Sequence, residues 1–276
     1  MPLTTQAFDW VCSLVRKESA IVLEKGKEYL VESRLVPLAR AAGAPDVSAF
    51  IEGVRVGHDR RKHMDIVEAL TTNETSWFRD GAPFTAFSTS VLPELKQSRS
   101  TTRSLRVWSA ACSTGQEVYS IAMLLKDSVV AEGWRAELLA TDISSEVLEK
   151  GRKGCYSQLE MNRGLPANLL VRHFSRQGPQ WQVNDDLRRM VTFQQMNLAM
   201  PFRGVGQFDV VFLRNVLIYF DVATKRDILT RVRQVLRPDG YLFLGGAETT
   251  LGVDDGWERT LIGRVSVHRP KNGGRS

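Results

Sequence analysis

The stretch Leu105-Arg-Val-Trp-Ser-Ala-Ala-Cys-Ser-Thr-Gly115-Gln-Glu117-Val-Tyr-Ser120 decides the fold. Its short apolar run ends in a cluster of small residues, and a helical pattern follows at once, which predicts a strand, a tight turn and the first turn of a helix. This order is typical of an open α/β sheet, in which ligands bind beyond the carboxyl ends of the strands. The sequence therefore predicts a Rossmann-like sheet with a ligand at this turn.

Two acidic residues limit which ligand this corner can bind. The run Glu137-Leu-Leu-Ala-Thr-Asp142 ends on an acid at the tip of the second predicted strand, where a carboxylate hydrogen-bonds ribose hydroxyls. The turn holds a single glycine, so the G-x-G-x-x-G pattern that cradles a pyrophosphate is absent, and Glu117 adds negative charge where a phosphate would lie. S-adenosylmethionine, a positively charged nucleoside without phosphate, suits both conditions. The alternative is a plain βαβ unit with incidental acids, which one acid alone would favour and two acids disfavour.

Length and composition are ordinary for a globular protein. The 276 residues suffice for one large domain or two modest ones, and 25% of them are charged. A net charge of +6 favours partners with acidic surfaces. The basic helices lack the interleaved aromatic residues of a nucleic-acid platform, so we expect no nucleic-acid partner.

The cysteines and the N-terminal sequence indicate the cellular compartment in which the protein works. Cys12, Cys112 and Cys155 are odd in number and form no C-x-x-C, which argues against a disulfide framework or a zinc site and favours a reducing cytoplasm. The four histidines show no metal spacing, so we expect no metal. The N-terminus shows no signal-peptide pattern, and no apolar run approaches the roughly 20 residues of a membrane span.

The pattern of apolar residues changes near residue 90. Residues 1–90 show helical spacing and predict an all-helical domain, whereas 91–103 ends in a polar, serine- and threonine-rich stretch and predicts a linker. Residues 104–276 then alternate strands with helices, which implies a parallel sheet flanked by helices, interrupted by a small inserted subdomain at about 155–190. The expected strands are 105–109, 136–141, 191–195, 208–213, 241–245 and a closing antiparallel edge at 263–268, and the expected helices are 115–127, 144–152 and 221–236.

The decapeptide Thr71-Thr-Asn-Glu-Thr-Ser-Trp-Phe-Arg-Asp80 concentrates amide, hydroxyl, aromatic and guanidinium groups. Taken alone, it is best explained as a helix boundary, with a polar capping residue and two aromatic residues in the core. Its place before a ligand-binding sheet favours a functional alternative. Arg79 could then clamp a carboxylate, and Asn73 or Thr75 could hold the polar end of a cofactor.

Polar residues also follow two later strands. Arg214 and Asn215 come directly after the buried run 208–213, at the edge where ligands bind. Arg214 has the alternative role of an ion-pair partner, so Asn215 and Tyr219 are the stronger site candidates. Asn197 reaches the same edge after the strand 191–195. Its apolar neighbours are candidates to flank an adenine ring, although such residues more often belong to the core.

The sequence shows no Ser-His-Asp order and no cluster of metal ligands. These absences fit methyl transfer to an oxygen that needs no strong base, because a carboxylate is already ionised at neutral pH. Such an enzyme mainly holds the acceptor in line with the methyl group and excludes water.

With these motifs assembled, the chain resembles the CheR family of chemotaxis receptor methyltransferases from about residue 8 to residue 268. The most specific matches are Thr71–Arg79, Trp108–Glu117, Ala140-Thr-Asp142 and Phe212–Phe220, in this order and at matching spacing. The resemblance implies a helical N-terminal domain that docks on receptors and an S-adenosylmethionine-binding α/β domain with a small antiparallel β insertion. It also implies transfer of methyl groups to glutamate side chains on the cytoplasmic helices of methyl-accepting chemoreceptors, which leaves glutamate methyl esters and S-adenosylhomocysteine.

The resemblance assigns roles to individual residues by motif position. Arg79 would lie by the transferring group, and Tyr219 near the cofactor sulfur. The implied cofactor contacts are Asn73, Thr75, Arg79, Glu117, Asp142, Asn197, Leu198, Arg214 and Asn215. The implied receptor contacts are Arg34, Arg40, Arg55, Arg60 and Arg61. We expect a monomer that is not inserted into the membrane.

The sequence departs from the family pattern at two places. Gln116 stands where members usually carry glutamate, which leaves Glu117 in place. The inserted subdomain has the short turn Phe174-Ser-Arg-Gln-Gly-Pro-Gln-Trp181, whereas members that tether to a receptor's C-terminal pentapeptide have a longer, glycine-richer loop. We therefore expect no such tether.

Two other functions remain open at this point. One is a methyltransferase for a small molecule or nucleic acid, although such an acceptor needs no docking domain. The other is a non-catalytic scaffold that binds S-adenosylmethionine, against which the retention of both Arg79 and Tyr219 counts.

Overall fold

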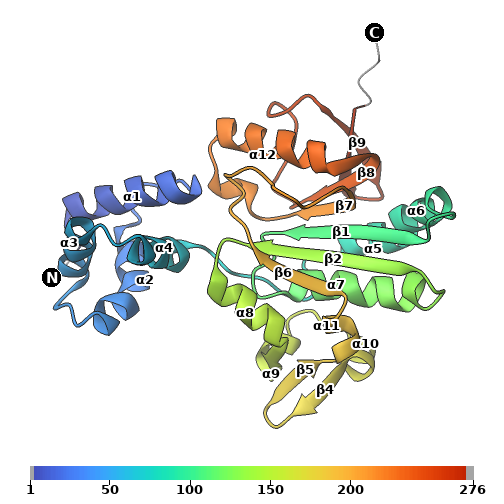
Figure 1. Cartoon of the computed structure of the whole chain (residues 1–276), viewed down its shortest axis with the longest axis horizontal. Coiled ribbons are helices and arrows are strands. Elements are labelled where there is room, and N and C mark those ends of the chain that lie inside the picture. Colours follow the sequence, from blue (N-terminus) through green and yellow to red (C-terminus); the bar gives the residue numbers. More distant parts are fainter. Residues whose placement is uncertain (1–2, 272–276) are drawn as a thin grey trace. The chain divides into compact units, whose positions relative to one another are not determined.

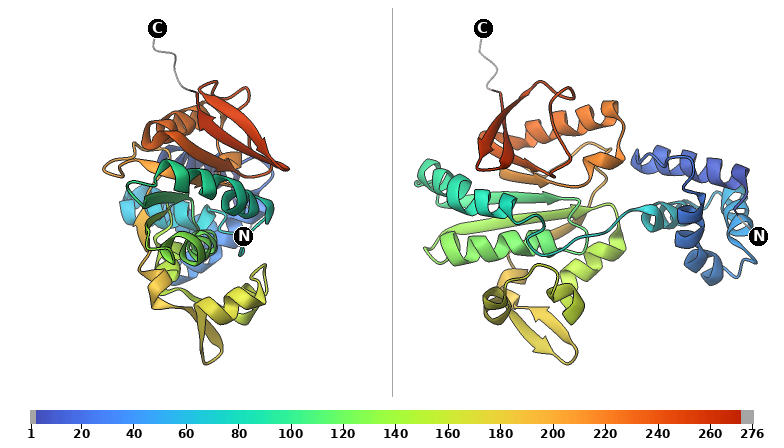
Figure 2. Two further views of the ribbon diagram at one scale, coloured as in Figure 1. Left: turned by 90° about the vertical axis from the view of Figure 1, so that its right-hand side faces the viewer. Right: turned by 180° about the vertical axis from the view of Figure 1, so that it is seen from behind.

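The computed structural model describes residues 3–271 and divides the chain into two units. One unit comprises the chain up to Thr72 together with Tyr219–Thr224, and the other comprises Asn73–Ile218 and the chain from Lys225 onward. Figures 1 and 2 show the elements of each unit. Among the described residues, no helix combines the length and the hydropathy that crossing a bilayer requires.

The first unit is all-helical. It contains α1 (Thr5–Ser19), α2 (Glu28–Ala41), α3 (Val47–Gly57) and α4 (Arg60–Leu70). Side chains of Thr4, Asp46 and Asp59 cap the backbone N–H groups at the starts of α1, α3 and α4, which satisfies donors that a helix start leaves unpaired. Fully buried apolar residues such as Val11 and Ile66 form the core of this small bundle.

The second unit is built on a seven-stranded sheet with the order β6-β2-β1-β7-β8-β10-β9. Its strands are β1 (Ser104–Ala110), β2 (Arg135–Asp142), β6 (Val191–Gln195), β7 (Phe208–Leu213), β8 (Leu236–Leu244), β9 (Trp257–Ile262) and β10 (Val265–Pro270). Strands β6, β2, β1, β7 and β8 are parallel, and β10 runs antiparallel to both β8 and β9. The carboxyl ends of β1, β2, β6 and β7 therefore meet at one edge.

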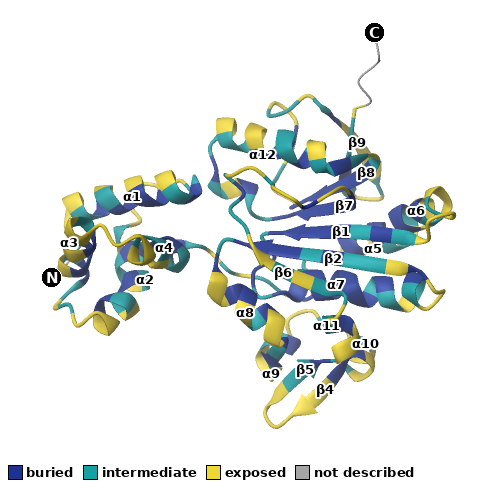
Figure 3. Ribbon diagram, viewed as in Figure 1, coloured by how far each residue is buried: buried dark blue, intermediate teal, exposed yellow. Residues whose placement is uncertain are grey.

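Helices cover the sheet unequally. The helices of this unit are α5 (Ala82–Ala86), α6 (Leu92–Ser98), α7 (Gln116–Leu125), α8 (Ser145–Lys153) and α11 (Asp185–Arg188), with π-helical segments η1 (Phe87–Val91) and η2 (Lys126–Val130). The unit also holds α12 (Val222–Val235) and the 3-10 helix η3 (Leu217–Tyr219), apart from their residues within 219–224, which belong to the first unit. Figure 1 shows α12 on the near side of the sheet, and the rear view in Figure 2 shows α5, α6 and α7 on the other. Every residue of β7 is buried, whereas the edge strand β6 is largely exposed (Figure 3).

A small subdomain is inserted between α8 and β6. It holds β3 (Cys155–Ser157), α9 (Gln158–Met161), α10 (Ala167–His173), β4 (Phe174–Gln177) and β5 (Gln180–Val183). Its three strands form a separate antiparallel sheet with the order β3-β5-β4. The fold class predicted from the sequence, a Rossmann-like sheet with a helical domain and a small inserted β subdomain, is confirmed.

Two expected features differ in the structure. Residues 91–103 were expected to be a linker, but α6 lies there with Leu92 and Leu95 buried, and the units divide between Thr72 and Asn73. The strand expected at 263–268 as the edge of the sheet is β10, which lies between β8 and β9, so β9 is the edge. Three polar residues in a row, at 258–260, stand between the apolar ends of β9, which therefore lacks the alternation that would reveal a strand.

Candidate active site

The turn after β1 is held in an uncommon backbone conformation. Ala111, Ser113 and Gly115 all have positive φ, at 59°, 50° and 96°. The Cys112 N–H donates to the Thr141 carbonyl at 2.9 Å, and the Ser113 N–H donates to the Asp142 Oδ2 at 2.8 Å. The Gly115 N–H donates back to the Cys112 carbonyl at 3.1 Å. These three N–H groups are used inside the fold and are therefore not available to bind a phosphate.

The Asp142 carboxylate is fixed at the tip of β2. It is 7% exposed, and its second oxygen, Oδ1, accepts from the Ser144 N–H at 3.0 Å. The Met196 N–H donates to the Asp142 carbonyl at 2.8 Å, which brings the end of β6 to the end of β2. Asn197 follows directly, and its Oδ1 accepts from the Ala199 N–H at 2.9 Å. Asp142, Asn197 and the buried Leu198 therefore share one part of the rim.

Glu117 and Arg214 form an ion pair at the centre of this rim. Arg214 Nη1 lies 2.9 Å from Glu117 Oε2, and the two side chains are 1% and 12% exposed. The other oxygen of Glu117 accepts from the Ser109 hydroxyl at 2.8 Å. Arg214 Nη2 donates to Asp80 Oδ2 at 2.7 Å and to the Arg79 carbonyl at 2.9 Å. Arg214 thus joins the end of β7, the start of α7 and the 79–80 turn, which is the ion-pair role that the sequence left open.

The segment 73–80 is anchored to the sheet unit at both ends. The Ser113 hydroxyl donates to the Asn73 carbonyl at 2.7 Å, and the Phe78 N–H donates to the Ser120 hydroxyl at 3.0 Å. Trp77 between them is 1% exposed. Asn73 and Thr75 line a pocket of about 180 Å³ that also includes residues of α8 and α9. The structure therefore brings both predicted contacts next to the turn after β1.

Two predicted residues are placed differently from the rest. The Arg79 guanidinium donates to the Glu74 carbonyl of its own loop at 3.0 Å. Tyr219 belongs to the helical unit, where its carbonyl accepts from the Val22 N–H at 3.0 Å. The roles of both residues near the reacting group stay predictions.

Backbone strain gathers at this rim. The described residues include eight non-glycine positions with positive φ, and five of them lie in the three segments just described: Phe78, Asp80, Ala111, Ser113 and Asn215. Such conformations cost of order 1–3 kcal/mol each and cluster where function requires a fixed geometry. The concentration makes the carboxyl ends of β1 and β7, with the segment 73–80 beside them, the candidate functional site.

Sequence reasoning missed three residues that build the site. Ser113 orients the turn, Asp80 pairs with Arg214, and Glu248 accepts from the N–H groups of residues 215–217. Asp80 lies inside the decapeptide that the sequence singled out, so that motif could have pointed to it. Glu248 is 33 positions from Asn215, and no local pattern predicts the contact.

The thiol at this turn is not a nucleophile. Cys112 is 1% exposed, and burial, reinforced by the charges of Asp142 and Glu117, raises its pKa well above the ordinary value. A thiol held protonated is a poor attacking group. Within the described part of the chain, no group of three or more histidine, cysteine or acidic side chains is placed to hold a metal ion.

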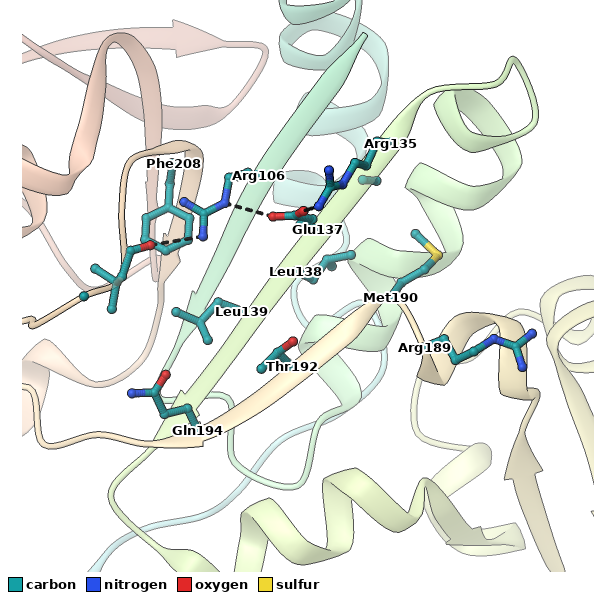
Figure 4. A pocket seen from close by; sticks show the side chains of 13 residues that line it. Arg106, Arg135, Glu137, Leu138, Leu139, Arg189, Met190, Thr192, Gln194 and Phe208 are labelled. Atoms are coloured by element: carbon teal, nitrogen blue, oxygen red, sulfur yellow. Dashed lines mark hydrogen bonds and ion pairs between the residues drawn. The ribbon is translucent and has the colours of Figure 1, made fainter. Parts of the chain in front are cut away.

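A second pocket, of about 580 Å³, lies on the face of β1, β2 and β6 and is lined by none of the predicted site residues. Figure 4 shows Arg106 and Arg135 directed toward Glu137 there, with Leu139, Thr192 and Gln194 along the strands. Arg106 is committed to the fold, since it donates to the carbonyls of Val205 and Gln207 as well as to Glu137. This pocket is therefore separate from the rim.

Comparison with known proteins agrees with this geometry. Residues 73–264 match the family described as "CheR methyltransferase, SAM binding domain", and residues 6–71 match "CheR methyltransferase, all-alpha domain". Chemotaxis protein methyltransferase 1 of Pseudomonas aeruginosa is 39% identical over 93% of this chain and 95% of its own length. Chemotaxis protein methyltransferase 1 of Vibrio cholerae is 37% identical over 98% of both chains, and the Escherichia coli chemotaxis protein methyltransferase is 36% identical over 90% of this chain and 86% of its own.

The two family matches together cover most of the helical unit and the sheet unit through β9, including the rim with its fixed carboxylates. The chain belongs to the CheR family of chemotaxis receptor methyltransferases, enzymes that use S-adenosylmethionine.

Proposed function

We propose that this enzyme transfers the methyl group of S-adenosylmethionine to glutamate side-chain carboxylates on the cytoplasmic helices of methyl-accepting chemoreceptors. The products would be glutamate methyl esters and S-adenosylhomocysteine. The observation that carries the proposal is the match of both units to one family, together with two oriented carboxylates, Glu117 and Asp142, at the rim of the sheet.

The residues at the rim suit this cofactor. The N–H groups of Cys112, Ser113 and Gly115 are used within the fold, which disfavours a phosphate-bearing ligand at this turn. The Asp142 carboxylate, oriented by two backbone N–H groups, suits the ribose hydroxyls. The carboxylates of Asp80, Glu117 and Asp142 outnumber the guanidinium groups of Arg79 and Arg214, which leaves negative charge for a cationic ligand although Arg214 pairs with Glu117. Further proposed contacts are Asn73, Thr75, Arg79, Asn197, Leu198, Arg214 and Asn215.

When bound, the cofactor supplies an electrophilic methyl group on a sulfonium sulfur. The protein has little proton chemistry to perform, since the acceptor carboxylate is ionised at neutral pH. We assign to Arg79 the orientation of the acceptor carboxylate, because a guanidinium can hold both its oxygens. Tyr219 is assigned to the neighbourhood of the sulfur. Catalysis is then chiefly positioning and exclusion of water.

The test uses labelled S-adenosylmethionine and the cytoplasmic fragment of a receptor. We expect label in the fragment that mild base releases as methanol, which is the signature of a carboxyl methyl ester. Because Arg79 is also a proposed cofactor contact, Arg79→Ala should bind S-adenosylhomocysteine more weakly and should lose transfer even at saturating cofactor. Arg203→Ala, at an exposed position, should retain both binding and transfer. Label that resists base would refute the carboxylate as the acceptor. Full activity of Arg79→Ala would refute the role of Arg79.

The helical unit is proposed to dock on the receptor. Two of the arginines predicted for this role are engaged within the unit: Arg34 donates to the carbonyls of Leu70 and Thr71, and Arg55 pairs with Glu52. The exposed Arg40, Arg60 and Arg61 are therefore the better candidates. Replacing these three by glutamine should raise the KM for receptor and leave the affinity for S-adenosylhomocysteine unchanged.

We also propose that the enzyme acts as a cytoplasmic monomer that needs no pentapeptide tether. The connection between β4 and β5 supports the last point, because only Gly178 and Pro179 separate the two strands. Titration calorimetry with a receptor C-terminal pentapeptide should show no binding. Micromolar affinity that is lost on changing residues of β4 would contradict this expectation.

A further inference from the structure

One carboxylate, that of Glu248, holds the chain where it leaves β7. Its Oε2 accepts from the N–H groups of Asn215 at 2.8 Å and Gly245 at 2.7 Å. Its Oε1 accepts from the N–H groups of Val216 at 2.8 Å and Leu217 at 2.7 Å. Glu248 lies after the end of β8, and its side chain thus accepts hydrogen bonds from four backbone N–H groups. Hydrogen bonds to a charged acceptor are the stronger class.

The surrounding backbone is shaped for this contact. Asn215 has φ of 58°, in the left-handed region, which asparagine adopts more readily than most non-glycine residues. Gly245 has no space for a side chain, since a Cβ there would lie 2.7 Å from Glu248 Oε2 and 2.9 Å from the Asn215 nitrogen. The Glu248 N–H donates to the Gly245 carbonyl at 2.9 Å and closes the loop that carries the carboxylate.

The carboxylate acts on residues that belong to the site. Asn215 is a proposed cofactor contact, and Arg214 before it forms the 2.9 Å ion pair with Glu117. Glu248 is half-buried and takes no part in that ion pair. The hydrogen bonds that its carboxylate accepts come from backbone groups, so its effect on the cofactor would pass through the conformation of residues 214–217.

We propose that Glu248 is a positioning residue for S-adenosylmethionine, one that sets the backbone of Arg214, Asn215 and Val216 so that this segment meets the cofactor. The proposal rests on the cofactor site assigned above. Its requirement is a carboxylate, because an amide has one acceptor oxygen. The amide's NH₂ group would face two of the four N–H donors and leave them unpaired.

The test compares Glu248→Gln and Glu248→Asp with two controls in the same unit. Asp254→Asn changes another carboxylate that holds backbone, since Asp254 accepts from the Gly256 N–H at 2.9 Å and from Trp257 Nε1 at 3.1 Å. Glu258→Gln repeats the chemical change at an exposed position on β9. For each variant the measurements are the Kd for S-adenosylhomocysteine by titration calorimetry, the melting temperature, and kcat and KM with receptor fragment.

At a temperature well below the melting point of the variant, we expect Glu248→Gln to raise the Kd about tenfold, a change of about 1.4 kcal/mol in binding free energy. Its KM for S-adenosylmethionine should rise, whereas its KM for receptor should not. Glu248→Asp keeps the charge and should recover part of the affinity. The proposal would be overturned if the Kd of Glu248→Gln stayed within twofold of the wild type, or if Asp254→Asn lost as much affinity. Glu248 would then have a purely structural role.

These measurements separate the proposal from the proposed function. If the wild-type chain binds S-adenosylhomocysteine but esterifies no receptor, the function fails and the Kd series still decides the role of Glu248. If the wild-type chain does not bind it, the cofactor site and the role of Glu248 fail together.

Discussion

The ion pair of Arg214 with Glu117 gives the sharpest prediction about stability. Arg214→Met keeps most of the side-chain volume but removes the positive charge that pairs with Glu117. The Glu117 carboxylate, which is 12% exposed, then keeps only its hydrogen bond from the Ser109 hydroxyl. Breaking a buried pair from one side costs about 3–5 kcal/mol. The Asp80 end adds about 0–1 kcal/mol, since Asp80 is 52% exposed and such pairs are weak. We therefore expect the free energy of unfolding of the second unit to fall by about 3–6 kcal/mol.

A double-mutant cycle isolates the pair from other effects of the substitution. Urea unfolding followed by tryptophan fluorescence would be measured for Arg214→Met, Glu117→Gln and the double variant, with Arg203→Met as an exposed control. Arg214→Met leaves a buried, unpaired charge on Glu117, and Glu117→Gln removes that charge. Glu117→Gln should therefore lower the free energy of unfolding far less in the Arg214→Met variant than in the wild type. We expect a coupling of at least about 1.5 kcal/mol. A coupling below about 0.5 kcal/mol would refute the reasoning that the pair holds the rim together.

Two further predictions concern the turn after β1 and a buried histidine. Gly115→Ala should weaken S-adenosylhomocysteine binding about tenfold or more, because φ is 96° and the new Cβ would lie 3.1 Å from Tyr156 Oη and 3.3 Å from Gly151 Cα. Gly26→Ala is the matched control, since its φ of 87° imposes a similar backbone cost with no atom within 4 Å of the new Cβ. It should leave binding unchanged, and equal losses in calorimetry would contradict the prediction. Burial lowers the pKa of His268 on β10, so the folded state binds fewer protons than the unfolded state, and the wild type should lose stability as the pH falls through about 6.5. His268→Leu should therefore gain stability relative to the wild type as the pH is lowered from about 7.5 to about 5.5, and a difference in melting temperature that does not change with pH would exclude this cause.

The sequence predicted those parts of the site whose signals are local. The strand, turn and helix around Gly115 and the acid at the end of β2 follow from apolar runs and small residues within a few positions of each other. The structure places both acids at the predicted edge, with the Ser113 N–H on Asp142 and Arg214 on Glu117.

Contacts between distant segments could not be predicted in this way. A helical pattern does not show which core the helix packs against. The sequence therefore places residues 82–90 in the helical domain and 91–98 in a linker. In the structure, Phe84 and Phe87 pack on Phe212 of β7, with ring centroids 5.9 and 5.6 Å apart. Glu248 was missed for the same reason, because its partners are backbone groups 31 or more positions earlier in the chain, apart from Gly245.

The most direct test of the account is a crystal structure of the enzyme with S-adenosylhomocysteine. The account predicts the nucleoside at the carboxyl edge of β1, β2 and β7, with its ribose hydroxyls in hydrogen-bond contact with Asp142 and Glu117 beside it. A ligand found instead in the pocket between Arg106 and Glu137 on the face of the sheet, or a rim that stays empty at saturating ligand, would contradict it.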